Sequence, residues 1–390
     1  MNTAKDVRVR KRVLLVTRNF PPLWGGMERL NLHMLAELAK EYDIRMIAPE
    51  GASAHAPTGV FVTEVPLKPL SWFLVRCMLA AILESWRWRP DVVLAGSGLT
   101  APVALVCAKL SRGRSIAYAH GLDMTVQHRL YRKLWYPAIR HLDSLIANSS
   151  PTKKLAEDIV GVDASRISVI HPGVSLPSPE ELLVGAAKNA EKQKFCRRYR
   201  LNEGPLLLSV GRLTERKGLR EFVRDVLPLI VSQYPNVSLA IVGDAPTDSL
   251  YATVQSSKSI REAAKEHGVE QNLFFLGKLF GQDLAHAYQA ADVHVFPIRD
   301  IPNDPEGFGM VAVESAAYGV PTVAYRTGGV VDAVEDYRSG RLVEPGNSVA
   351  FAEAIFYYLN NVTNYMAISS FSKKFCWSNF GTSIIKSISG

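Results

Sequence analysis

Residues 12–40 read RVLLVTRNFPPLWGGMERLNLHMLAELAK. The stretch begins with a short run of Val and Leu, and residues 27–40 carry apolar side chains at helical spacing. Pro21 and Pro22 stiffen the loop between these parts, and two glycines stand just before the expected helix. The pattern predicts a strand, a loop and a helix, which is the repeating unit of a parallel sheet covered by helices.

The same alternation of short apolar runs and helical patterns continues along the chain. In the first half we expect strands at residues 12–17, 43–48, 91–95, 114–119, 143–147 and 166–170. In the second half we expect them at residues 206–210, 238–242, 272–276, 292–296, 321–324 and 341–343. Strands that alternate with helices indicate parallel sheets, and the two series predict an α/β protein with two doubly wound, Rossmann-like domains.

A run rich in proline ends the first series and sets the expected domain boundary. We expect a first domain over residues 1–178, a linker over 179–204 and a second domain over 205–364. The remaining residues are too many for one more crossover helix. We therefore expect a C-terminal helix, about residues 365–390, to return to the first domain.

The composition is that of a globular protein, with 47% hydrophobic and 21% charged residues among 390. The net charge is +8, and residues 1–180 carry all of it, with 23 Lys and Arg against 15 Asp and Glu. Residues 181–390 are balanced at 22 against 22. The excess fits an anionic partner of the first half, although solvated surface is an equal interpretation.

We expect no targeting segment. The basic start lacks the apolar core of a signal peptide, and the most apolar window, residues 71–83, is shorter than the roughly 20 residues of a membrane span. We expect a cytoplasmic protein. Residues 71–89 combine three Trp with three Arg, which suits peripheral contact with the inner face of the membrane or an ordinary crossover helix.

Ligands of open parallel sheets bind beyond the carboxyl ends of the strands, so the loops there are the candidate sites. In the first half, Gly25 and Gly26 precede a helix, where backbone amides can approach a phosphate. His120 and Gly121 follow the strand RSIAYA, and a histidine there could hydrogen-bond a substrate hydroxyl.

In the second half, the loop after the strand LLLSV reads GRLTERKG. Arg212 and Lys217, behind Gly211, offer a guanidinium fork and a point charge that suit the two phosphates of a diphosphate. A solvated basic loop is the alternative. The loops that contain Asp244 and the pair Lys278 and Leu279 could wall a nucleotide base.

Residues 304–315, DPEGFGMVAVES, combine two carboxylates with a helix start. The amides of Phe308, Gly309, Met310 and Val311 would be the unpaired donors of its first turn and form an anion site. Glu306 can then reach sugar hydroxyls. Glu314 is five residues after Gly309, about 7.5 Å along a helix, and can accept hydrogen bonds from a ribose diol. A charge among Val and Ala is costly to bury unless it has partners.

The ordered set of the GG loop, HG, GRLTERKG, GDAP and EGFGMVAVE resembles the retaining GT-B glycosyltransferases of family GT4, and among these the bacterial mannosyltransferase-like branch. The resemblance covers about residues 12–365. Its closing part is GVPTVAYRTGGVVDAVEDYRSGRLVEPGN. Ser315, where the family often has alanine, is a conservative departure.

The resemblance implies a cleft between an acceptor-binding first domain and a donor-binding second domain. It implies that Glu306 binds the transferred sugar and that Glu314 binds the ribose. Arg212 and Lys217 would stabilise the departing diphosphate, and His120 would lie beside the sugar's O6. Gly25 and Gly26 would contact phosphates or make room for acceptor and sugar.

We therefore expect a hexosyltransferase that moves a sugar from GDP-mannose or a UDP-sugar to a glycan or lipid-linked acceptor in bacterial surface polysaccharide synthesis. The sequence has no Asp-x-Asp metal motif, so we expect no metal and no cofactor, and neutralisation of the leaving group by Arg212, Lys217 and the helix start. A sugar-nucleotide epimerase of the same fold and a non-catalytic nucleotide-sugar-binding protein are the alternatives. Nucleic acid is the least expected partner, because the basic residues form no recognised motif.

Overall fold

The computed structural model describes residues 10–245 and 254–389. The basic start of the chain, residues 1–9, lies outside the described residues, as do residues 246–253 and Gly390. The chain divides into two compact units. Unit 1 comprises Met1–Gly173 and Trp377–Gly390, and unit 2 comprises Val174–Cys376.

Unit 1 contains a seven-stranded sheet in which every strand pairs in parallel with its neighbours. Its strands are β1 (Arg12–Val16), β2 (Asp43–Pro49), β3 (Phe61–Val65), β4 (Val92–Ala95), β5 (Arg114–Ala119), β6 (Ser144–Ala147) and β7 (Ile167–Val169). Their order is β3-β2-β1-β4-β5-β6-β7, so the winding reverses between β1 and β4.

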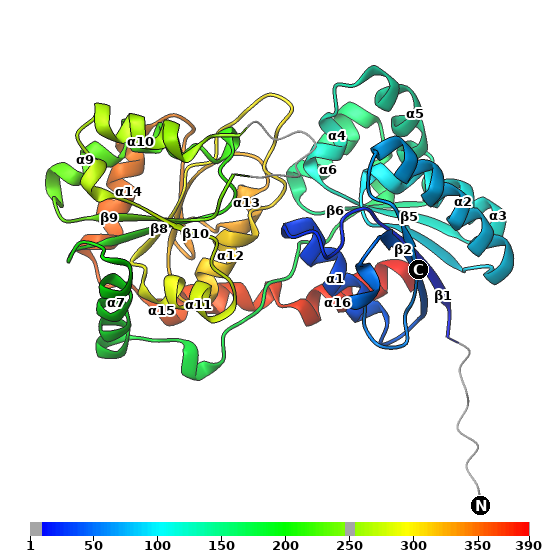
Figure 1. The fold of residues 1–390 in the computed structure, drawn as a ribbon, viewed down its shortest axis with the longest axis horizontal. Helices are drawn as coiled ribbons and strands as arrows, with labels where there is room; N and C mark the ends of the chain where they lie inside the picture. The colour runs from blue at the N-terminus through cyan, green and yellow to red at the C-terminus, as the bar shows by residue number, and fades with distance from the viewer. Residues whose placement is uncertain (1–9, 246–253, 390) are drawn as a thin grey trace, which may run out of the picture. The chain divides into compact units, whose positions relative to one another are not determined.

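Helices cover the sheet of unit 1. They are α1 (Gly26–Leu38), α2 (Leu70–Trp88), α3 (Ala101–Ser111), α4 (Gly121–Thr125), α5 (Arg129–Arg140), α6 (Ser150–Leu155) and α16 (Trp377–Ser389). Helices α2, α3 and α5 bury apolar side chains in one core with strands β1, β4 and β6. The C-terminal helix α16 packs beside α1, so the end of the chain belongs to the same unit as its beginning (Figure 1).

Unit 2 contains a six-stranded parallel sheet of the order β10-β9-β8-β11-β12-β13. Its strands are β8 (Leu206–Val210), β9 (Ser238–Val242), β10 (Leu273–Gly277), β11 (Val293–Phe296), β12 (Thr322–Tyr325) and β13 (Gly340–Val343). Its helices are α7 (Gly185–Tyr199), α8 (Leu219–Asp225), α9 (Leu227–Gln233), α10 (Ser257–Glu266), α11 (Gly281–Ala290), α12 (Met310–Ala317), α13 (Val330–Ala333), α14 (Ser348–Asn360) and α15 (Tyr365–Ser372). The inner strands β8 and β9 are buried along their whole length, which explains why their sequences, LLLSV and SLAIV, are almost entirely apolar.

The prediction of two doubly wound domains and of a returning C-terminal helix is confirmed. Two details differ. The sequence missed β3, because FVTEV is an edge strand with only Val65 buried. The chain passes between the units at Gly173 and Trp377 rather than near residues 178 and 365, so α7 and α15 lie in unit 2, packed on α11 and α12.

Candidate functional site

The strand order of unit 2 reverses between β8 and β11. The loop after β8 contains Arg212 and Lys217, and the loop after β11 contains Glu306. Ligands of open α/β sheets bind at such a reversal, beyond the carboxyl ends of the strands. The sheet topology therefore brings together the loops that the sequence singled out separately.

Gly211 and Gly243 put the loops after β8 and β9 in direct backbone contact. Gly243 has a φ of +129°, and a Cβ there would lie 2.0 Å from the carbonyl oxygen of Gly211. The Gly243 amide donates to the carbonyl of Gly277 over 2.8 Å, and the Leu213 amide donates to the carbonyl of Asp244 over 3.0 Å. Only glycine fits at this crossing, which fixes the start of the basic loop beside Asp244.

The expected sugar ligand and one of the expected diphosphate ligands contact each other directly. Lys217 Nζ donates to Glu306 Oε2 over 2.8 Å. Arg216 Nε lies 3.2 Å from the same oxygen, and an N–H of the same guanidinium donates to Asp304. The side chains of Arg216, Lys217 and Glu306 are at most 15% exposed. The sequence analysis assigned Lys217 and Glu306 but foresaw neither their ion pair nor the part of Arg216.

The surrounding cations determine the ionisation of Glu306. Burial acts to raise the pKa of its carboxyl, but the charges of Lys217, Arg216 and Arg212 and the hydrogen bond from Lys217 lower the pKa to about 2. Burial lowers the pKa of Lys217, against the effect of Glu306. Arg212 itself is exposed. The site therefore holds an ionised carboxylate close to three cationic side chains.

The start of α12 lies beside this cluster. Gly309, with a φ of +93°, precedes the helix, and Met310 is its first residue. The Gly329 amide donates to the carbonyl of Glu306 over 2.8 Å, and Phe308 is buried in the core. This packing fixes the backbone around the first amides of α12, which have no acceptors within the helix.

Glu314 has a partner that the sequence did not reveal. The hydroxyl of Tyr288, a buried residue of α11, donates to Glu314 Oε2 over 3.2 Å. Leu279 and Val311 pack against the apolar cluster that includes Tyr288. Lys278 is exposed. Tyr288 therefore supplies one of the hydrogen bonds that a half-buried carboxylate on an apolar helix needs.

In unit 1 the corresponding loop after β1 rests on a carboxylate. Gly25 precedes α1 in extended conformation, and Gly26 is the first residue of the helix. Asn19 Nδ2 donates to Glu28 Oε1 over 2.9 Å, and a Cβ on Gly25 would lie 2.5 Å from Glu28 Oε2. Glu28 thus shapes the two-glycine loop and brings a negative charge near the positive end of α1.

His120 follows β5 and is buried. Its amide and that of Gly98 donate to Asp123 Oδ2 over 2.8 and 2.9 Å. Burial lowers the pKa of His120. The charge of Asp123, a hydrogen bond with the Gly96 backbone and the charge of Glu28 act to raise this pKa but do not outweigh burial. The imidazole is therefore neutral at pH 7, and its Nε2 has no hydrogen-bond partner among the described residues.

Each unit thus gathers its own part of the predicted set at the carboxyl edge of its sheet. In unit 1 these are Gly25, Gly26 and His120, and in unit 2 they are Gly211, Arg212, Lys217, Asp244, Lys278, Leu279, Glu306, Phe308, Gly309, Met310, Val311 and Glu314. The ligand-binding roles of these residues stay predictions. Sequence reasoning missed Arg216, Tyr288, Glu28 and Asp123, because each acts on another side chain or on a loop.

Two family descriptions match the chain, one in each half. Residues 24–177 match "Glycosyltransferase Family 4", and residues 191–375 match "Glycosyl transferases group 1". The D-inositol 3-phosphate glycosyltransferase of Mycobacterium marinum is 30% identical over 385 residues, which cover 90% of this chain and 78% of that protein.

A second relative is the GDP-mannose-dependent alpha-(1-6)-phosphatidylinositol monomannoside mannosyltransferase of Mycolicibacterium smegmatis. It is 26% identical over 366 residues, 88% of each chain. In fold the chain is similar to Anabaena HepE, crystallised with UDP, with a TM-score of 0.76 at 18% identity over 97% of this chain and 99% of that one. The chain belongs to the family 4 glycosyltransferases and has their GT-B fold.

Proposed function

We propose that the protein is a retaining transferase that moves a hexose from a nucleotide-diphosphate sugar to a hydroxyl of a glycan or lipid-linked acceptor. The observation that carries the proposal is the contact of Lys217 with Glu306, beside Arg212 and the start of α12. One edge of one sheet then presents cations for a diphosphate and a carboxylate for sugar hydroxyls. No feature of the described residues favours an epimerase or a non-catalytic binding protein over a transferase.

In the proposed reaction the acceptor oxygen forms a bond to the anomeric carbon on the face from which the diphosphate leaves. The bond between that carbon and the β-phosphate oxygen breaks, and the electron pair stays on the phosphate. The acceptor proton passes to a phosphate oxygen. Arg212, Lys217 and the first amides of α12 stabilise the developing negative charge, with no part for a metal.

Replacement of Arg212 tests this electrostatic role. Arg212→Ala should lower turnover at saturating donor by roughly 100-fold, as expected when one charge-stabilising donor is removed. Proton NMR of the product should show the anomeric configuration of the donor. Wild-type turnover in Arg212→Ala, or an inverted product, contradicts the mechanism, and release of an altered nucleotide sugar without acceptor indicates an epimerase.

The relative from M. smegmatis is GDP-mannose-dependent by its name, which favours GDP-mannose as the donor here. HepE was crystallised with UDP, so UDP-sugars need the same test. A thermal-shift panel of GDP, UDP, GDP-mannose and UDP-glucose distinguishes the bases, because a ligand that binds the folded state raises the unfolding temperature.

We further propose that the partner of unit 1 is an anionic membrane surface. Among the described residues, no helix combines the length and apolar character needed to cross a bilayer. Helix α2 nevertheless exposes large apolar side chains along one face, at Trp72, Val75, Leu79, Leu83 and Trp86, of which Trp86 is 72% exposed. Their spacing of three and four residues is that of a single helical stripe.

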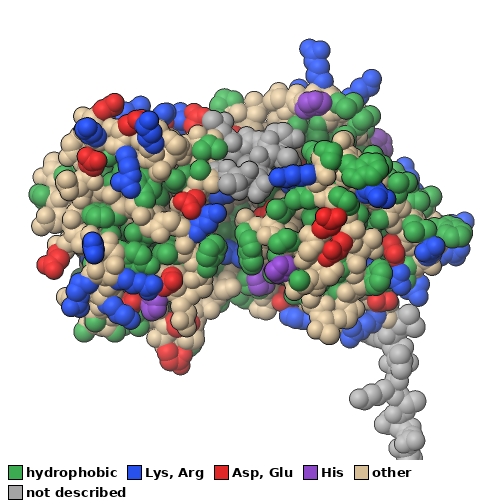
Figure 2. Space-filling model, in the orientation of Figure 1, with side chains coloured by type: hydrophobic (Ala, Val, Ile, Leu, Met, Phe, Trp, Pro, Cys, Tyr) green, Lys and Arg blue, Asp and Glu red, His purple; other side chains and the backbone are tan. Residues whose placement is uncertain are grey.

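The neighbouring helices extend this face. Leu110 of α3 and Leu130 and Leu134 of α5 are each more than half exposed, and α3 contacts both α2 and α5. Residues 66–142 contain 11 Lys and Arg but only 3 Asp and Glu. Figure 2 shows apolar and basic side chains together over these helices. Exposed apolar side chains among cations suit the interface of an anionic bilayer.

Liposome flotation tests the membrane contact. The protein should float with vesicles of phosphatidylglycerol and phosphatidylcholine but not with phosphatidylcholine alone, and Leu79→Glu should reduce flotation. Leu229→Glu, at an exposed leucine of unit 2, is the control. Flotation that is equal for the two vesicle types, or unchanged in Leu79→Glu, contradicts this part of the proposal.

A further inference from the structure

Arg216, in the loop after β8, forms ion pairs with two buried or half-buried carboxylates of the protein, Asp304 and Glu306. Its Nε lies 3.2 Å from Glu306 Oε2. A second guanidinium nitrogen donates to Asp304 and to the carbonyl of Pro305 over 3.3 Å. The side chain is 8% exposed. Arg216 therefore has two carboxylates as partners and little access to solvent.

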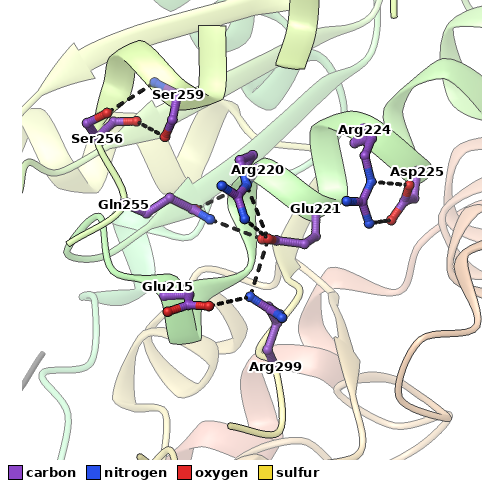
Figure 3. A network of polar contacts seen from close by, with 9 residues as sticks. All are labelled: Glu215, Arg220, Glu221, Arg224, Asp225, Gln255, Ser256, Ser259 and Arg299. Atoms are coloured by element: carbon purple, nitrogen blue, oxygen red, sulfur yellow. Dashed lines mark hydrogen bonds and ion pairs between the residues drawn. The ribbon is translucent and has the colours of Figure 1, made fainter. Parts of the chain in front are cut away.

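Arg216 is also fixed through its backbone. Its carbonyl accepts a hydrogen bond from the Arg299 amide over 2.8 Å. The Arg299 side chain in turn lies 3.1 Å from Glu215 and 3.3 Å from Glu221, as Figure 3 shows. The loops after β8 and β11 are thus joined at the backbone of Arg216. Its planar guanidinium cannot follow a ligand without breaking several contacts.

The Lys217 side chain differs from that of Arg216. Its flexible side chain ends in an ammonium group with three donors, of which Glu306 uses one over 2.8 Å. A diphosphate brought to Lys217 would compete with Glu306 for this group. The carboxylate would then depend on its second cation, which is Arg216.

We propose that Arg216 is a positioning residue that holds the Glu306 carboxylate ionised and in place while Lys217 serves the diphosphate of the donor. The inference rests on the proposed function for the role of Lys217. The competing interpretation, that Arg216 is a third phosphate ligand, is disfavoured because Asp304 and Glu306 already occupy its guanidinium. The two interpretations differ in what loss of Arg216 does to nucleotide binding.

The experiment compares Arg216→Ala and Arg216→Lys with Arg299→Ala. Arg299→Ala is the matched control, because it removes an arginine from the same junction of loops without touching Glu306. Titration calorimetry with GDP and UDP measures nucleotide affinity. Release of GDP from GDP-mannose, or of UDP from UDP-glucose, measures kcat and KM.

For Arg216→Ala we expect GDP or UDP affinity within about twofold of wild type but a roughly 10- to 100-fold lower kcat/KM, because a buried carboxylate loses one of its cationic partners. Arg216→Lys should recover part of this loss because it keeps the charge without the fork. Arg299→Ala should show neither effect. Equal losses of nucleotide affinity and kcat/KM in Arg216→Ala, or a matching loss in Arg299→Ala, overturn the proposal.

A second readout needs no donor. Without Arg216 the Glu306 carboxyl loses a counter-ion, so its pKa in the folded protein moves back toward the unfolded value of 4.5. The thermal midpoint of Arg216→Ala should therefore fall less between about pH 4.5 and pH 2 than that of wild type. The difference should be smaller when both proteins carry Glu306→Gln, because only the contact of Arg216 with Asp304 then remains to be lost. An acid dependence unchanged by Arg216→Ala overturns the positioning role. A smaller fall in Arg216→Ala, together with a wild-type protein that releases nucleotide from neither donor, contradicts the proposed function alone.

Discussion

Gly243→Ala should lower both the unfolding midpoint and the affinity for nucleotide, because it adds a steric clash to the strain of a positive φ. A Cβ at position 243 would lie 2.0 Å from the Gly211 carbonyl oxygen, whereas real Cβ atoms essentially never come closer than 3.0 Å. The loop after β8 must therefore shift by about 1 Å. Gly268→Ala is the matched control in the same unit, because Gly268 also has a positive φ, +70°, but no heavy atom within 4 Å of the added Cβ.

The two substitutions separate strain from contact. A positive φ costs alanine about 1–2 kcal/mol, which is the whole effect expected at Gly268 and lowers the unfolding midpoint by about 2–8 °C. At Gly243 the backbone contact adds to the strain, for a total above about 4 kcal/mol and a decrease of about 8–16 °C. The shifted loop carries Arg212 and Lys217, so affinity for GDP or UDP should also fall at least about tenfold.

Differential scanning calorimetry and titration with GDP and UDP measure these effects. The expected result is a large fall in both midpoint and affinity for Gly243→Ala and a small fall in midpoint alone for Gly268→Ala. The reasoning is refuted if the two variants unfold at the same temperature and both bind nucleotide like wild type. The contact between the loops after β8 and β9 would then not be what fixes the basic loop.

Three further predictions concern carboxylates and their donors. Tyr288→Phe removes the hydroxyl that donates to Glu314; GDP or UDP affinity should change by about 3- to 10-fold in calorimetry while the fold, by circular dichroism, is kept. The pKa of Glu306 lies below its unfolded value of 4.5, so the carboxylate stabilises the fold above that pH and the gain is lost as pH falls to about 2. The thermal midpoint of Glu306→Gln should therefore fall less over this range than that of wild type. Asn19→Ala removes a donor to the buried Glu28 and should cost about 1.5–3 kcal/mol, seen as a lower midpoint in calorimetry; an unchanged midpoint contradicts it.

The strands that could be predicted from the sequence are recognisable for one physical reason, which is burial. Strands such as β8 and β9 are buried on both faces, so their sequences are almost entirely apolar and can be recognised without knowledge of their neighbours. Strand β3 pairs only with β2 and buries only Val65, so its sequence looks like a loop. The passage between the units at Trp377 leaves no proline or glycine mark at that point, which is why its position was missed.

The candidate site divides in a similar way. Lys217 and Glu306 were predicted because each lies in a short motif within a loop that follows a strand. Arg216 was missed because its partner Asp304 is 88 residues away along the chain. Tyr288 was missed because a tyrosine on an amphipathic helix looks like any core residue until the fold places its hydroxyl beside Glu314. Partners supplied by another element are outside the reach of local sequence patterns.

The charges of this cluster explain why its cations are not interchangeable. Lys217 and Arg216 balance Glu306 and Asp304, so these four side chains sum to zero. Attraction of a dianionic diphosphate from a distance must then come from Arg212, which is exposed, and from the start of α12. Such attraction is screened by salt within about 8–10 Å, whereas the buried contacts of Glu306 are screened much less. Nucleotide capture should thus depend on ionic strength, while the geometry that holds the sugar should not.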